Sequence, residues 1–157
     1  MGRLLDLQIR KASQKIVWLK KRVDLLIGAL EKMKHWYLIF AGEYSCGKGP
    51  EWRRYAEKLG VADRIIWTGF LTGQELIEAL SASDLFALIS ENENFGMVVV
   101  EAMMCGLPVM ISKDVGVWED IKNEPFTILA ERSVDSVVRG MSIFCDILGI
   151  AVNGKGS

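Results

Sequence analysis

Short apolar runs alternate with amphipathic stretches from residue 23 to residue 148. Helical spacing of apolar residues predicts helices over residues 23–33, 51–59, 74–81 and 95–105, and Ser133 is a candidate N-cap for a last helix ending near residue 148. Compact apolar runs predict strands over residues 36–41, 64–68, 84–89, 109–112 and 126–129. Strands separated by helices favour a Rossmann-like α/β domain, with a parallel sheet, helices on both faces and ligands at the carboxyl ends of the strands.

The two ends of the chain are less well defined. Leu5, Leu7 and Ile9 alternate as in a strand, whereas residues 4–21 as a whole fit a basic amphipathic helix equally well. We therefore leave residues 1–20 unassigned. Residues 149–157 end in Gly-Lys-Gly-Ser and predict a frayed tail, and the length of the chain favours a single domain over residues 1–157.

The composition favours a small-molecule or protein partner. Of the 157 residues 50% are hydrophobic and 25% charged, and a net charge of −1 gives no reason to expect nucleic acid. Cys46, Cys105 and Cys145 are odd in number and far apart, which argues against a disulfide framework or a zinc site and for a cytoplasmic location. A basic cluster before residue 23 is typical of a solvated face and leaves peripheral membrane contact open; its members are Lys11, Lys15, Lys20, Lys21 and Arg22.

The segment GEYSCGKGP, residues 42–50, is close to the phosphate loop of nucleotide hydrolases. That loop ends in Ser or Thr, whose hydroxyl binds magnesium, but here Gly49 takes this position and Pro50 follows. We therefore interpret the segment as a glycine-rich turn and expect the helix to begin at Glu51. Gly42 remains a candidate binding residue, because a glycine at a strand end lets the backbone approach a ligand closely.

The segment SENENFGMVVVEAMMCGLPVMIS, residues 90–112, is more informative. Glu93 follows a predicted strand, and the free amides of the next helix begin near Gly96 and Met97, where they favour a diphosphate. Glu101 lies about one turn inside this helix and interrupts an apolar stripe, where a buried carboxylate would need a ligand or a basic partner. Because carboxylates accept hydrogen bonds from hydroxyls, a ligand with hydroxyls on both sides of a diphosphate fits, and this ligand is a nucleotide sugar.

These residues resemble the signature of family 4 glycosyltransferases, which are retaining enzymes of the GT-B fold. The pattern consists of Ser90, Glu93, Phe95-Gly96, Glu101-Ala102-Met103, Gly106-Leu107-Pro108-Val109 and Gly116. VDLLIGAL, YLIFAG, LGVADRIIWTGFLTGQEL and SASDLFALIS also resemble the carboxy-terminal, donor-binding half of that family, in the same order.

The resemblance implies roles for individual residues. Glu101 would bind the ribose hydroxyls, Glu93 would face the transferred sugar, and Lys21 would neutralise the diphosphate leaving group. The other implied contacts are Asn94, Phe95, Gly96 and Met97 at the diphosphate and sugar, and Gly69, Phe70 and Leu71 near the base. Cations and helix amides can stabilise the leaving group without a metal, so neither a metal nor a cofactor is expected.

The chain departs from the family in two respects. The family's Gly-Arg before the lysine is absent; Lys15 is one position off, and Arg10 or Arg3 would need a longer loop. The acceptor-binding half is also missing, so we expect negligible transferase activity from these residues alone and a second domain or subunit as partner. The alternatives are a non-catalytic subunit or remnant that binds a partner protein, a sugar-nucleotide epimerase half and, more remotely, a phosphate-loop hydrolase.

Overall fold

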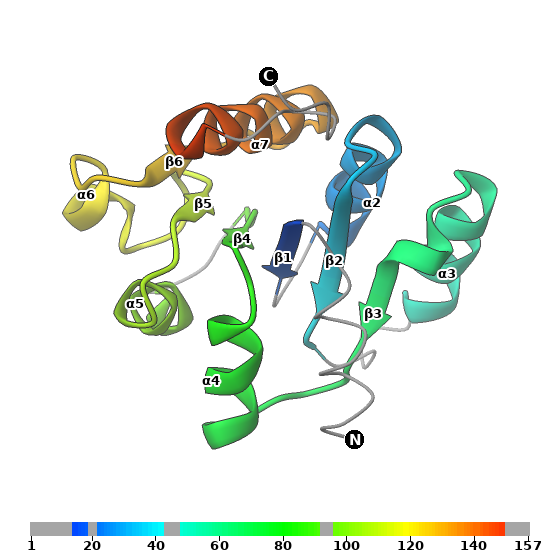
Figure 1. Cartoon of the computed structure of the whole chain (residues 1–157), viewed down its shortest axis with the longest axis horizontal. Helices are drawn as coiled ribbons and strands as arrows, with labels where there is room; N and C mark the ends of the chain where they lie inside the picture. The colour runs from blue at the N-terminus through cyan, green and yellow to red at the C-terminus, as the bar shows by residue number, and fades with distance from the viewer. Residues whose placement is uncertain (1–13, 19–21, 43–47, 92–95, 150–157) are drawn as a thin grey trace.

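A six-stranded parallel sheet forms the centre of the protein (Figure 1). This computed structural model describes residues 14–18, 22–42, 48–91 and 96–149. The spatial order β3-β2-β1-β4-β5-β6 is that of a doubly wound Rossmann sheet, which confirms the predicted fold class. The strands are β1 (Gln14–Trp18), β2 (Trp36–Phe40), β3 (Ile65–Trp67), β4 (Leu85–Leu88), β5 (Val109–Ile111) and β6 (Thr127–Leu129).

Helices cover both faces of the sheet (Figure 1). One face packs against α2 (Val23–Lys32), α3 (Gly49–Lys58) and α7 (Val134–Leu148). The opposite face packs against α4 (Gly73–Ser81), α5 (Met97–Met104) and α6 (Trp118–Ile121), and a short 3-10 helix, η1 (Ala62–Arg64), precedes β3. Because all six strands are parallel, their carboxyl ends meet at one edge of the sheet.

The strands β2 and β4 are apolar because each face of the sheet has its own core. In β4, Leu85 and Ala87 belong to the cluster under α2 and α7, whereas Phe86 and Leu88 belong to the cluster under α5. Successive side chains of a strand point to opposite faces, so a strand buried on both sides appears in the sequence as a continuous apolar run. This explains why β2 and β4 are predictable from hydrophobicity alone.

A strand at Gln14–Trp18 replaces one of the two N-terminal interpretations. The helix expected over residues 4–21 is wrong, and the strand expected around residues 5–9 lies outside the described residues. β1 pairs with β2 from Gln14↔Trp36 to Trp18↔Phe40, and also with β4. Pairing on both sides outweighs the weak helical periodicity of this segment, and the sequence Ile-Val-Trp suits a strand.

Smaller differences concern helix boundaries. α3 begins at Gly49, two residues before the predicted start, because Pro50 in the first turn lacks only an amide that has no intrahelical partner. The sequence predicted neither η1 nor α6, which are too short to show a helical period. Gly149, expected to begin the frayed tail, ends α7 with φ 64°, and residues 150–157 lie outside the described part.

Candidate functional site

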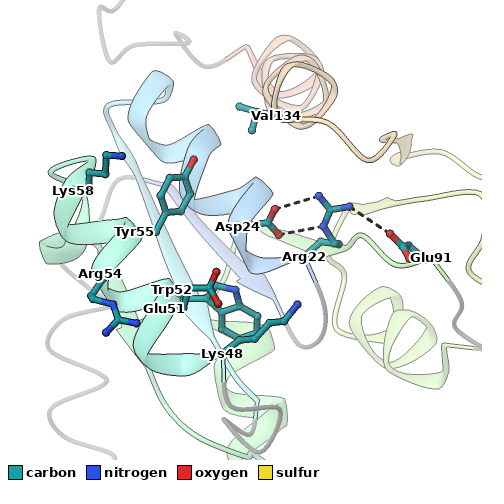
Figure 2. Close-up of a pocket in the computed structure, with 10 residues that line it drawn as sticks. All are labelled: Arg22, Asp24, Lys48, Glu51, Trp52, Arg54, Tyr55, Lys58, Glu91 and Val134. Atoms are coloured by element: carbon teal, nitrogen blue, oxygen red, sulfur yellow. Dashed lines mark hydrogen bonds and ion pairs between the residues drawn. The ribbon is translucent and has the colours of Figure 1, made fainter.

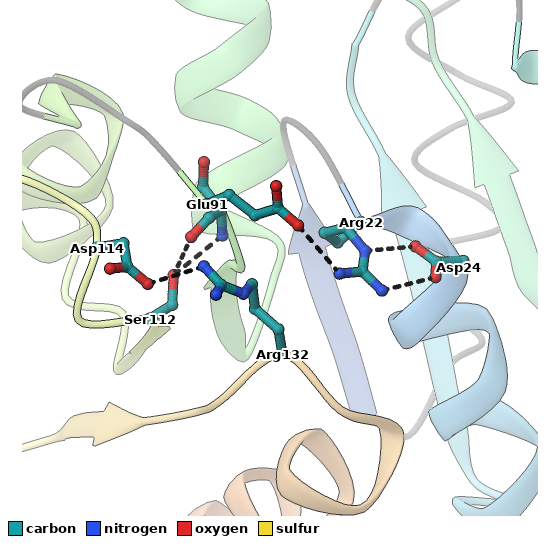
Figure 3. A network of polar contacts seen from close by, with 7 residues as sticks. Arg22, Asp24, Glu91, Ser112, Asp114 and Arg132 are labelled. Carbon is teal, nitrogen blue, oxygen red and sulfur yellow. Dashed lines mark hydrogen bonds and ion pairs between the residues drawn. The ribbon is translucent and has the colours of Figure 1, made fainter.

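The winding direction of the sheet reverses between β1 and β4, where a ligand crevice is expected in a Rossmann domain. Arg22, which precedes α2, and Glu91, which follows β4, meet at this point, with Nη1 of Arg22 3.6 Å from Oε1 of Glu91 (Figure 3). Lys21 and Glu93, the two predicted catalytic residues, are one and two positions away along the chain and lie outside the described residues, as do Asn94 and Phe95.

Arg22 lies directly before α2 and has a left-handed backbone, with φ 58° and ψ 39°. Its Nε and Nη2 donate hydrogen bonds of 3.2 Å each to Oδ1 and Oδ2 of Asp24. These bonds, followed by the charges of Asp24 and Glu91, raise the pKa of the guanidinium although partial burial opposes them. Arg22 is therefore less solvated than expected, because its side chain is only 33% exposed and is paired with two carboxylates.

Buried serines join the carboxyl ends of β4 and β5 immediately before Glu91. The amide of Ser90 donates to Oγ of Ser112 at 3.0 Å, and this hydroxyl donates to the carbonyl oxygen of Ser90 at 2.8 Å (Figure 3). Further along the same edge, Nη1 of Arg132 donates to Oδ2 of Asp114 at 3.0 Å. The two serines fix the backbone from which Glu91 reaches Arg22.

A cavity of about 780 Å³ opens beside Arg22, between α2 and α3 (Figure 2). Trp52 and Tyr55 of α3 form part of its wall, and Val134 at the start of α7 closes one side. Its basic lining residues are Arg22, Lys48, Arg54 and Lys58, and its acidic ones are Asp24, Glu51 and Glu91. Sequence reasoning missed this cavity, because the helical pattern of α3 gives no sign that its face is opposite α2.

The predicted diphosphate residues lie at the start of α5. Gly96 is buried with φ 79°, and a Cβ there would lie 2.8 Å from Cγ1 of Val115. Met97 is the first residue of the helix and is 60% exposed. Glu101 is exposed to solvent, so the expected burial of its carboxylate is wrong and gives no argument for a ligand.

The other predicted binding residues follow β2 and β3. Gly42 is buried directly after β2, and Gly69 has φ 75° with no atom within 4 Å of the position that a Cβ would take. Phe70 is 65% exposed, whereas Leu71 is 5% exposed and packs with Ala41 and Ala79. Phe70 is therefore the one of the two side chains that is open to a flat ligand group.

Two further observations concern the described part of the chain. No group of three or more His, Cys, Asp or Glu side chains there could hold a metal ion. None of its helices is both long enough and apolar enough to cross a membrane.

Known proteins resemble this chain in sequence and in structure. The sequence profile of the family described as "Glycosyl transferases group 1" matches residues 17–145. The sulfoquinovosyl transferase SQD2 of Arabidopsis thaliana is 34% identical over 108 residues, which make up 69% of this chain and 20% of that protein. HepE of Anabaena, solved in complex with UDP and glucose, superposes with a TM-score of 0.77 at 25% identity, over 92% of this chain and 41% of that chain.

A third similarity concerns an isolated domain. The C-terminal domain of LpcC from Francisella tularensis, a glycosyl transferase group 1 family protein, superposes with a TM-score of 0.74. The match covers 89% of this chain and 81% of that domain at 21% identity, and so shows a shared fold alone. The chain thus spans about a fifth of the Arabidopsis relative and less than half of the Anabaena structure.

Proposed function

Because this chain belongs to the group 1 glycosyl transferases, we propose that it forms the donor-binding half of a retaining family 4 enzyme and binds a UDP- or GDP-linked sugar. The main supporting observation is the contact between Arg22 and Glu91, since it brings the chain neighbours of Lys21 and Glu93 to one crevice. HepE, which has been solved with UDP and glucose and with UDP-glucose, shares this fold.

The proposed chemistry is stabilisation of a diphosphate leaving group. Departure of a nucleoside diphosphate builds negative charge, which Lys21 and the amides at the start of α5, near Gly96 and Met97, would offset. Glu93 would face the transferred sugar, and Glu101 would accept hydrogen bonds from the ribose hydroxyls. The step as proposed uses no metal ion or cofactor.

Transfer also requires an acceptor, which in this proposal is held by a second domain or subunit. The chain alone would then bind the donor without appreciable turnover. We place the working enzyme in the cytoplasm, where the basic residues before α2 would allow peripheral contact with an anionic membrane.

Calorimetric titration with UDP, GDP, UDP-glucose and GDP-mannose tests this proposal. Glu101→Ala should weaken binding of the preferred nucleotide about 10- to 100-fold, because a hydrogen bond to a charged group contributes about 1.5–3 kcal/mol. The 2′-deoxy form of the same nucleotide lacks one of the hydroxyls, so the variant should lose less affinity for it.

The control is Glu78→Ala, which removes an exposed carboxylate from α4 and should leave binding unchanged. Indifference of the wild-type protein to every nucleotide in the panel would contradict donor binding. If Glu101→Ala lost the same affinity for the ribose and deoxyribose forms, only the proposed role of Glu101 would be contradicted, and donor binding itself would not.

The absence of Gly-Arg before Lys21 favours a second candidate function. Without this cation the chain could act as a non-catalytic subunit that binds a partner protein through the face where an acceptor domain docks. This alternative predicts that the chain binds none of the nucleotides. It also predicts that the chain forms a stable complex with a partner protein, detected by size-exclusion chromatography with light scattering. The remote hydrolase alternative predicts magnesium-dependent ATP or GTP turnover, which we do not expect because Gly49 replaces the required hydroxyl.

A further inference from the structure

Arg22 has an unusual backbone for its residue type. Its φ of 58° lies in the left-handed region, which is costly for residues other than glycine and is maintained only where surrounding contacts determine it. Its side chain gives α2 no capping hydrogen bond, so helix capping does not explain the choice of arginine. Glycine would adopt the same backbone at lower cost.

The two carboxylates that hold Arg22 are not equivalent. Asp24 accepts two hydrogen bonds of 3.2 Å, whereas Glu91 approaches one nitrogen, Nη1, at 3.6 Å. The Glu91 side chain is 66% exposed and that of Asp24 is 43% exposed. Asp24 therefore orients the guanidinium, and Glu91 is a weakly held partner that another anion can replace.

The position of this guanidinium favours an anion larger than the single carboxylate of Glu91. It lies at the point where the sheet reverses direction, and it borders the cavity between α2 and α3, to which Lys48 and Arg54 add positive charge (Figure 2). A planar guanidinium can bind two phosphate oxygens at once, which a single ammonium group cannot do.

We propose that Arg22 is a phosphate-binding residue of the donor site, and that the diphosphate of the nucleotide displaces Glu91 from Arg22 while Asp24 keeps the guanidinium in place. This inference rests on the proposed function, because it assumes that a nucleoside diphosphate enters this crevice. It supplies a cation at the site from the position directly after Lys21.

A double-mutant cycle on UDP and GDP affinity tests the exchange of partners. Arg22→Gln should weaken nucleotide binding about 10- to 100-fold, as expected for loss of a charged hydrogen bond. Arg22→Lys should keep only part of the wild-type affinity. Glu91→Gln should strengthen binding about 3- to 10-fold, in the range of one weak ion pair. In the Arg22→Gln background, Glu91→Gln should have little effect, because there is no guanidinium left to release.

Charge-matched controls come from the other end of α2. Lys32 and Asp135 form an exposed pair with 2.9 Å between Nζ and Oδ1. Ten residues separate Lys32 from Arg22, which is about 15 Å along a helix. Lys32→Gln and Asp135→Asn change the net charge by the same amounts as the test variants and should change nucleotide affinity by less than about 2-fold.

Stability measurements separate binding from a structural role. Arg22→Gly removes the cost of the left-handed backbone and should raise Tm while it weakens nucleotide binding, whereas Arg22→Gln should weaken binding without raising Tm. A lower Tm of Arg22→Gly with unchanged affinity would show that Arg22 is structural and would overturn the inference.

The remaining outcomes distinguish failure of the proposed function from failure of the inference about Arg22. A wild-type protein that binds neither UDP nor GDP would contradict both the proposed function and this inference. If the wild type binds and Arg22→Gln binds equally well, the inference alone is overturned. A gain from Glu91→Gln that persists in the Arg22→Gln background would mean simple repulsion of the ligand by Glu91, and would overturn the exchange of partners.

Discussion

Gly96 is the residue at which backbone and packing constraints coincide most clearly. Its φ is 79°, and a Cβ would lie 2.8 Å from Cγ1 of Val115 and 3.3 Å from Cγ2 of Val99. The left-handed backbone costs another residue about 1–2 kcal/mol, and overpacking a core adds about 1–3 kcal/mol. We predict that Gly96→Ala lowers the free energy of unfolding by about 2–5 kcal/mol, measured by urea denaturation.

Gly106, just beyond the other end of α5, provides the matched control. Its φ is 81°, but nothing lies within 4 Å of the position that a Cβ would take. Gly106→Ala should therefore lose only the backbone contribution of about 1–2 kcal/mol. Equal losses for the two variants would mean that Val115 moves aside at no cost.

Individual residues also show what the sequence could and could not predict about the site. The sequence identified Gly96 and Met97 as the start of a helix, because strand, turn and helix patterns follow each other there. It placed Arg22 on a solvated face and Glu101 on a buried stripe, whereas Arg22 is partly buried and Glu101 is exposed to solvent. Burial depends on which element packs against which, and a single position in a pattern does not contain that information.

The α7 helix tests how a helix start is stabilised. Oγ of Ser133 accepts a hydrogen bond of 3.1 Å from the amide of Ser136, as predicted for its N-cap. Ser133→Ala should lower the free energy of unfolding by about 1 kcal/mol, because one amide of the first turn loses its acceptor.

Ser142, in the same helix, is the control for Ser133. Its Oγ donates to the carbonyl oxygen of Val138 at 2.9 Å, a bond that helices do not need. Ser142→Ala should leave the urea midpoint unchanged or raise it slightly, since alanine has the higher helix propensity. A loss as large as that of Ser133→Ala would argue against the capping explanation.

Helices and strands differed in how well hydrophobic patterns located them. The long periodic helices α2, α4 and α7 and the buried strands β2 and β4 were predicted within two residues at each end. β1 was missed, because charged and polar residues surround a short apolar run and its two partner strands lie far away in sequence. Segments stabilised by distant partners are the ones that local patterns describe least well.

The order of the strands was beyond the reach of the sequence patterns. Alternating helices and strands predict a parallel sheet, but not that β4 returns to pair with β1. This return creates the crevice and brings Arg22 to Glu91, although the two residues are far apart along the chain. The candidate site is therefore a product of topology more than of any single motif.

The central place of β1 leads to a prediction for the stability of the entire sheet. Ile16 is in register with Leu38 of β2 and with Leu85 of β4, so both amide and carbonyl groups of this strand face hydrogen-bonding neighbours. Proline at this position removes a ladder hydrogen bond from a central strand, whereas prolines in sheets are confined to edge strands, strand starts and bulges. We expect Ile16→Pro to abolish or strongly weaken cooperative unfolding, followed by circular dichroism in urea.

The edge strand β6 offers the corresponding control. The amide of Ala130 donates to the carbonyl oxygen of Ile111 at 3.0 Å, so the amide of the preceding residue, Leu129, points away from β5. Leu129→Pro removes no hydrogen bond of the β5–β6 ladder, and proline is tolerated on such an edge. It should therefore keep cooperative unfolding, with a loss well below that of Ile16→Pro. Similar losses for the two variants would contradict the central position of β1, and with it the crevice between β1 and β4 on which the proposed donor binding depends.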